Sequence, residues 1–154
     1  MKNNKSILMI QSEEYNGKDE WKSDFCLHDD SLLFIDKASN NILAEVIIVD
    51  DFSYIQIDSF EVKRTLRNKG VARECIKILM DYSLSLGKKG LTGGATQDAT
   101  AFWSRIGADI TFSDECDYCN GDCDSCEYYD EDELNDFILK PMSFYSYYET
   151  RKTN

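Results

Sequence analysis

The fold of this 154-residue chain is decided by the stretch Glu61-Val62-Lys63-Arg64-Thr65-Leu66-Arg67-Asn68-Lys69-Gly70-Val71-Ala72. The run 54–62, which ends inside this stretch, has the composition of a β-strand. Apolar residues after it recur at spacings of three and four, which predicts a helix over 70–86: Val71, Ala72, Cys75, Ile76, Leu79 and Tyr82. The sequence therefore predicts a strand, a short basic turn and a helix in succession.

The basic turn would lie at the N-terminus of that helix, where main-chain N–H groups and the positive end of the helix dipole point outward. This geometry binds phosphate. Gly70 removes a side chain where a ligand must come close, and Arg67 and Lys69 add positive charge beside it. The alternative interpretation is a capped surface helix that binds nothing.

The spacing within the turn adds a resemblance to a known family. Val62, four further residues and then Arg67-Asn68-Lys69-Gly70-Val71-Ala72 resemble the Val…Arg-x-x-Gly-x-Gly/Ala signature of the GNAT superfamily of acyl-CoA-dependent N-acetyltransferases. Residues 96–108 resemble the Asn-x-x-Ala-x-x-Phe-Tyr-x-x-x-Gly-Phe helix of the same family. Three positions depart from that pattern: Thr96 stands for Asn, Trp103 for Tyr and Ala108 for Phe.

The resemblance implies that acetyl-CoA is the cosubstrate and that its acetyl group passes to an amine. It assigns contacts with the cofactor to Phe60, Val62, Arg67, Asn68, Lys69, Gly70, Val71, Ala72, Thr96 and Phe102. It also implies that a carboxylate on the strand accepts the proton of the amine.

Asp58 and Glu61 are the two candidates for this catalytic base. Alternation along a strand places Asp58 on the face of Phe60 and Val62, and Glu61 on the opposite face. The alternative for each is an exposed strand charge. Trp103 cannot be the general acid that the family's Tyr provides, because an indole N–H only donates a hydrogen bond. Tyr145, Tyr147 or Tyr148 could replace it, and nothing in the sequence selects one.

The remaining patterns predict an α/β fold with a mixed, mostly antiparallel central sheet flanked by helices, in a single domain over 1–154. The predicted strands are 7–10, 32–36, 42–50, 54–62, 91–95, 110–112 and 137–140, and the second helix is 96–106. In the family, the region corresponding to 13–30 usually forms two helices that shape the acceptor pocket. That region is short here.

A cysteine motif lies within an insertion predicted over 114–133. Its spacing is C-x2-C-x3-C-x2-C, formed by Cys116, Cys119, Cys123 and Cys126. Four thiols this close predict one tetrahedral, structural zinc ion. A redox-active or disulfide-forming loop and an inert acidic loop are the alternatives.

The net charge of −12 is concentrated in one segment. Eleven acidic residues and no basic ones lie between Asp114 and Asp136; without them, 18 of the 29 acidic residues remain against 17 Lys and Arg. Such a segment would attract a cationic acceptor, such as a protein lysine or N-terminus, a polyamine or an aminoglycoside, or it only solubilises the loop. The basic residues around the turn fit one polyphosphate ligand, not a nucleic acid.

The early apolar run 7–10 is too short for a signal peptide or a membrane span, so we expect a cytoplasmic protein with no membrane partner. The sequence leaves open whether the chain is a monomer or a homodimer. The competing class of function is a catalytically inactive acyl-CoA-binding or protein-interaction module that acts through the acidic loop.

Overall fold

The computed structural model describes residues 6–21, 31–111 and 134–152. The chain divides into two compact units, Met1–Leu91 and Thr92–Asn154. The prediction of a single domain over 1–154 stays a prediction.

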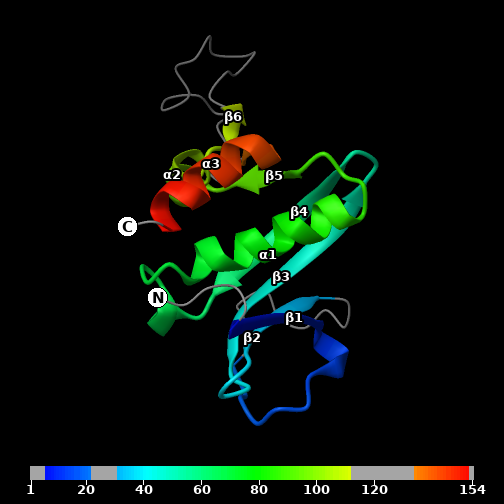
Figure 1. Ribbon diagram of the computed structural model, residues 1–154, viewed down its shortest axis with the longest axis vertical. Coiled ribbons are helices and arrows are strands. Elements are labelled where there is room, and N and C mark those ends of the chain that lie inside the picture. The colour runs from blue at the N-terminus through cyan, green and yellow to red at the C-terminus, as the bar shows by residue number, and fades with distance from the viewer. Residues whose placement is uncertain (1–5, 22–30, 112–133, 153–154) are drawn as a thin grey trace, which may run out of the picture. The chain divides into compact units, whose positions relative to one another are not determined.

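The first unit is an antiparallel meander of four strands with one long helix. The strands are β1 (Ile7–Gln11), β2 (Leu32–Asp36), β3 (Ile42–Asp51) and β4 (Tyr54–Val62), each paired with the next. Two short 3-10 turns, η2 (Ser12–Glu14) and η3 (Arg64–Leu66), follow β1 and β4. Helix α1 (Val71–Ser85) packs along β3 and β4 (Figure 1).

Helix α1 buries the side that the apolar spacing predicts. Cys75, Ile76, Leu79 and Met80 are completely buried. The helix ends just before Gly87, which has a left-handed φ of +76°. Glycine adopts this conformation readily because it has no Cβ. The sequence therefore predicts both the extent of this helix and its packing side.

The sheet contains two β-bulges, each of which shifts the register between neighbouring strands. Ile47 pairs with Ser59 and Ile48 with Ile57, so Asp58 is an extra residue of β4, a β-bulge. Phe34 pairs with Ala44 and Ile35 with Ile42, so Leu43 is the corresponding extra residue of β3 opposite β2. The second bulge explains why the consecutive residues 42–44 are all buried, which simple alternation does not produce.

The second unit combines short strands and two helices. Its elements are β5 (Leu91–Ala95, which begins at the last residue of the first unit), α2 (Gln97–Arg105), β6 (Asp109–Thr111), β7 (Asn135–Leu139) and α3 (Pro141–Lys152). Their strand order is β5-β7-β6, and β6 and β7 are antiparallel. The buried residues of this unit include Trp103, Ile106, Phe137, Leu139 and Phe144.

The predicted fold class is confirmed: strands and helices are mixed, and the paired strands are mostly antiparallel. The pair of late strands is present as β6 and β7. Helix α3 was not predicted. No helix in the described part of the chain is long and apolar enough to cross a membrane.

Candidate functional site

The turn for which the sequence predicts phosphate binding lies between β4 and α1. Gly70 precedes the helix with a φ of +82°, and a Cβ built on it would lie 3.1 Å from Arg73 Nη2. The first main-chain bond of the helix runs from the Glu74 N–H to the Gly70 carbonyl (3.2 Å). Since a helix offers no acceptor to the N–H groups before that bond, those of Val71, Ala72 and Arg73 point out of the helix end. This is the geometry of an anion-binding helix start.

The main chain at the end of β4 has a defined direction. The Lys63 N–H donates to the Leu43 carbonyl (2.9 Å). Because bonding alternates along an antiparallel strand, Phe60 and Val62 direct their N–H and C=O groups away from β3. The side chains of both residues pack within the protein. Val62 is buried, and the Phe60 ring contacts the Phe34 ring edge-on, with 6.3 Å between the ring centres.

The two candidate carboxylates have different surroundings. Asp58, in the bulge, is exposed and accepts a hydrogen bond from Gln56 Nε2 (3.0 Å). The Glu61 side chain is only 12% exposed, and its Oε1 lies 3.6 Å from Arg67 Nη2. The structure therefore brings Glu61, and not Asp58, to Arg67 in the turn between β4 and α1.

The predicted cations of the turn do not share one role. Arg67 Nε donates to the Val62 carbonyl (3.1 Å), so its guanidinium is directed at β4. Asn68, with a left-handed φ of +64°, and Lys69 are exposed. Arg73, on the first turn of α1, lies 3.8 Å from the Glu74 carboxylate.

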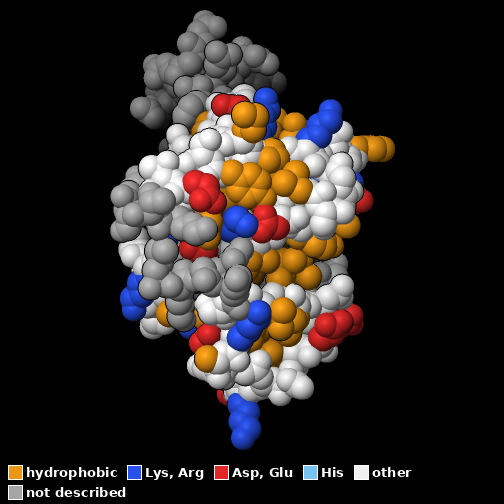
Figure 2. All heavy atoms as spheres, in the orientation of Figure 1, with side chains coloured by type: hydrophobic (Ala, Val, Ile, Leu, Met, Phe, Trp, Pro, Cys, Tyr) orange, Lys and Arg blue, Asp and Glu red, His pale blue; other side chains and the backbone are white. Residues whose placement is uncertain are grey.

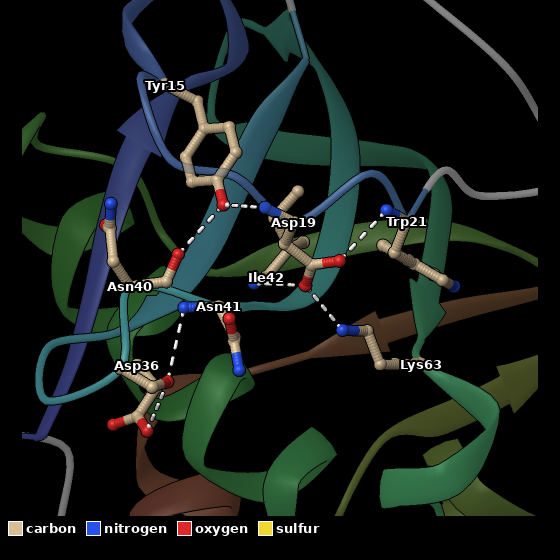
Figure 3. Close-up of polar contacts among 9 residues, drawn as sticks. Tyr15, Asp19, Trp21, Asp36, Asn40, Asn41, Ile42 and Lys63 are labelled. Atoms are coloured by element: carbon tan, nitrogen blue, oxygen red, sulfur yellow. Dashed lines mark hydrogen bonds and ion pairs between the residues drawn. The ribbon is translucent and has the colours of Figure 1, made fainter.

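A polar cluster around Asp19 fixes the segment that precedes β2 (Figure 3). Asp19 Oδ1 accepts from the Trp21 N–H (3.0 Å), and Oδ2 accepts from the Ile42 N–H (2.9 Å) and from Lys63 Nζ (2.6 Å). The Tyr15 hydroxyl accepts from the Asp19 N–H (3.1 Å) and donates to the Asn40 carbonyl (2.8 Å). The cluster ties this segment to the residue that directly follows β4.

Two opposing effects act on the pKa of Asp19. Burial raises it, but the hydrogen bonds from Lys63, Trp21 and Ile42 together with the charge of Lys63 outweigh burial and lower it. The Lys63 ammonium also lies 5.9 Å from the centre of the Trp21 ring. Sequence reasoning missed this cluster, because no local pattern relates residue 19 to residues 42 and 63.

In the second unit, Thr96 directly precedes α2 and Phe102 lies within this helix. Thr96 Oγ1 accepts from the Ala99 N–H (3.3 Å) and so caps the helix. The Phe102 ring meets Trp103 at 5.2 Å and 77°. Trp103 is 5% exposed and stacks on Phe137 at 4.0 Å and 13°, which makes it a core residue.

The three candidate tyrosines surround Phe144 on α3. The ring centres of Tyr145, Tyr147 and Tyr148 lie 5.8, 6.3 and 5.8 Å from that of Phe144. The predicted zinc ligands Cys116, Cys119, Cys123 and Cys126 lie outside the described residues. Among the residues that the structure does describe, no group of three or more His, Cys, Asp or Glu could hold a metal ion.

The chain matches the model of the acetyltransferase (GNAT) family over residues 5–108. A search of curated proteins finds no match.

Solved structures share the fold at low identity. A putative streptothricin acetyltransferase from Bacillus anthracis, in complex with acetyl coenzyme A, is 16% identical with a TM-score of 0.55, over 72% of this chain and 61% of that one. A putative N-acetyltransferase from Lactobacillus plantarum is 9% identical with a TM-score of 0.59, over 87% and 96%. An IAA acetyltransferase from Bacillus cereus is 15% identical with a TM-score of 0.52, over 71% and 77%.

Proposed function

The chain belongs to the GNAT family of acetyltransferases, and we propose that it transfers an acetyl group from acetyl-CoA to a primary amine. The observation that carries the proposal is the outward-pointing start of α1, set directly after β4 behind a glycine with a φ of +82°. A Cβ at that glycine would meet the Arg73 guanidinium at 3.1 Å, and side chains rarely adopt its positive φ. The residues therefore fit a ligand whose phosphates lie against the main chain.

The proposed contacts follow from the directions of the main chain. The N–H groups of Val71, Ala72 and Arg73 would hold the pyrophosphate, with Asn68 and Lys69 exposed beside them. Phe60 and Val62 would bind the pantetheine arm through main-chain groups that point away from β3. The contacts predicted for Thr96 and Phe102, which belong to the second unit, stay predictions.

Acetyl-CoA would supply an acetyl group activated as a thioester. In the transfer, the amine nitrogen bonds to the acetyl carbon, the carbon–sulfur bond breaks and CoA leaves as the thiolate, while the amine loses one proton. We assign the acceptance of that proton to Glu61, because its carboxylate is largely buried and adjoins the turn. Asp58 is the second candidate.

We propose a cationic acceptor. The support is the concentration of eleven acidic residues between Asp114 and Asp136. On the face drawn in Figure 2, by contrast, acidic and basic side chains of the described residues are interspersed. A field confined to one segment attracts cations to that segment. A structural zinc ion held by the four cysteines of the same segment is part of the proposal.

A catalytically inactive acyl-CoA-binding module is the second candidate function. It is favoured by one observation: Trp103 occupies the position of the family's Tyr and is buried against Phe137, with no hydroxyl to protonate the leaving thiolate. Both functions need the phosphate-binding turn.

Two measurements separate these functions. Calorimetry with acetyl-CoA tests the turn, and release of free thiol from acetyl-CoA, followed against a panel of amines, tests transfer. We expect binding, and thiol release that depends on an amine and is strongly reduced, but still measurable, in Glu61→Gln. Binding without release against any amine would favour the inactive module, and absence of binding would refute both.

A further inference from the structure

Arg67 belongs to the phosphate-binding turn by sequence, yet its side chain returns to β4. Nε donates to the Val62 carbonyl (3.1 Å), and Nη2 lies 3.6 Å from Glu61 Oε1. The Arg67 side chain is 48% exposed, whereas that of Glu61 is 12% exposed. One guanidinium therefore bridges the turn and the last two residues of the strand.

We propose that Arg67 is a positioning residue for the Glu61 carboxylate and not a ligand of the phosphates. The inference rests on the proposed function, since it requires Glu61 to accept the proton of the amine. The planar guanidinium fixes two groups at once, because its donors have a rigid arrangement. An ammonium on a flexible stem would satisfy one group at a time.

The neighbour of Glu61 across the sheet explains why such a bridge is needed. Glu61 pairs directly with Glu45 on β3, so two carboxylates share one face, an arrangement that is unfavourable without a cation. Glu45 Oε2 accepts a hydrogen bond from the Oγ of Ser31, a buried residue (2.8 Å). The Arg67 guanidinium approaches Glu61 from the turn, which favours a Glu61 rotamer directed toward the turn.

Calorimetry with acetyl-CoA distinguishes a positioning residue from a phosphate ligand. We expect Arg67→Gln to change the Kd for acetyl-CoA by less than about threefold, as does the matched control Arg64→Gln, which removes an exposed arginine of η3. A loss of about tenfold or more in Arg67→Gln alone would make Arg67 a phosphate ligand and overturn the inference.

Turnover with an active amine from the panel gives the second readout. We expect Arg67→Gln to lower kcat by about tenfold with little change in the KM for acetyl-CoA, and Arg67→Lys to recover part of the loss. The double variant Glu61→Gln/Arg67→Gln should be no slower than Glu61→Gln alone. Equal, independent losses from the two substitutions would overturn the inference while the proposed function stood.

Nitrogen-15 NMR of the full chain needs no acceptor. The Arg67 Nε–H signal, identified by its absence in Arg67→Gln, should exchange slowly with solvent in the wild type and several-fold faster in Glu61→Gln. An Arg67 Nε–H exchange rate that is the same in the wild type and in Glu61→Gln would overturn the inference. A wild-type protein that binds no acetyl-CoA and transfers no acetyl group would overturn the proposed function and this inference together.

Discussion

Asp19 joins three segments of the first unit through a single carboxylate. Its side chain is 15% exposed, and it accepts hydrogen bonds from the main chain of Trp21, from the main chain of Ile42 and from Lys63 Nζ. Hydrogen bonds to a charged group are stronger than those between neutral groups. The Asp19 carboxylate therefore ties the start of β3 to the residue that directly follows β4, the strand that carries Glu61.

Asp19→Asn should lower the free energy of unfolding by about 2 kcal/mol, because an amide cannot replace a carboxylate that accepts from an ammonium. Since folding lowers the pKa of Asp19, its contribution is full above the unfolded value of 3.8 and is lost as the pH falls through the lower folded value. Urea unfolding measured between pH 7 and pH 3 checks both statements.

The control is Asp81→Asn, which breaks the more exposed pair with Lys77 and should cost under about 1 kcal/mol. Equal costs for Asp19→Asn and Asp81→Asn, with the same dependence on pH, would show that the Asp19 cluster contributes no more than a surface ion pair.

At the scale of single residues, the sequence identified two candidates for the catalytic base but did not distinguish between them. Residue type and alternation identified Asp58 and Glu61. Their different surroundings come from the bulge at Asp58 and from the direction of the Arg67 side chain, and both depend on contacts with other segments. Alternation carries no information about an extra residue in a strand.

At the scale of elements, the ends of helices were predictable and α3 was not. Thr96, Gly87 and Gly107 mark helix boundaries by their own conformational preferences, which are local. Helix α3 is rich in aromatic residues, a composition typical of strands. The signal that could have revealed it is Pro141, which occupies the first helical position.

Gly107→Ala should destabilise the protein by roughly 1–3 kcal/mol, more than Gly87→Ala does. Both glycines have a positive φ, but a Cβ on Gly107 would lie 2.9 Å from the Ser143 carbonyl oxygen, whereas a Cβ on Gly87 would meet nothing within 4 Å. Gly87→Ala should therefore cost only the backbone strain, about 1 kcal/mol. Urea unfolding of the two variants compares them, and equal losses would contradict the described contact between Gly107 and α3.

At the scale of the whole molecule, two predictions concern the segment 114–133. This segment lies outside the described residues, so both predictions rest on its sequence. Protein purified without added metal should contain about one zinc ion per chain, because four thiolates complete a tetrahedral shell. Cys119→Ser should lose it, and Cys75→Ser, at a buried cysteine of α1, should retain it. Elemental analysis decides, and metal-free protein with four reactive thiols would refute the zinc site.

The second prediction concerns charge. We expect the joint neutralisation of Asp130, Glu131, Asp132 and Glu133 to raise the KM for a polycationic amine more than it lowers kcat. Added salt should reduce the difference in KM between the wild type and this variant, because surface fields are screened beyond about 8 Å at physiological ionic strength. Steady-state kinetics with polycationic and neutral amines is the measurement. Identical kinetics for both amines in the wild type and the variant would leave the acidic residues with a solubilising role only.

The central claim, that the start of α1 binds acetyl-CoA, is tested most directly by calorimetry on Gly70→Asp and Gly87→Asp. Both substitutions put a carboxylate on a glycine of positive φ flanking α1, one at each end. We expect Gly70→Asp to weaken acetyl-CoA binding by about tenfold or more, because its carboxylate occupies the phosphate position, while Gly87→Asp binds like the wild type. Unchanged affinity in a folded Gly70→Asp protein would contradict the claim.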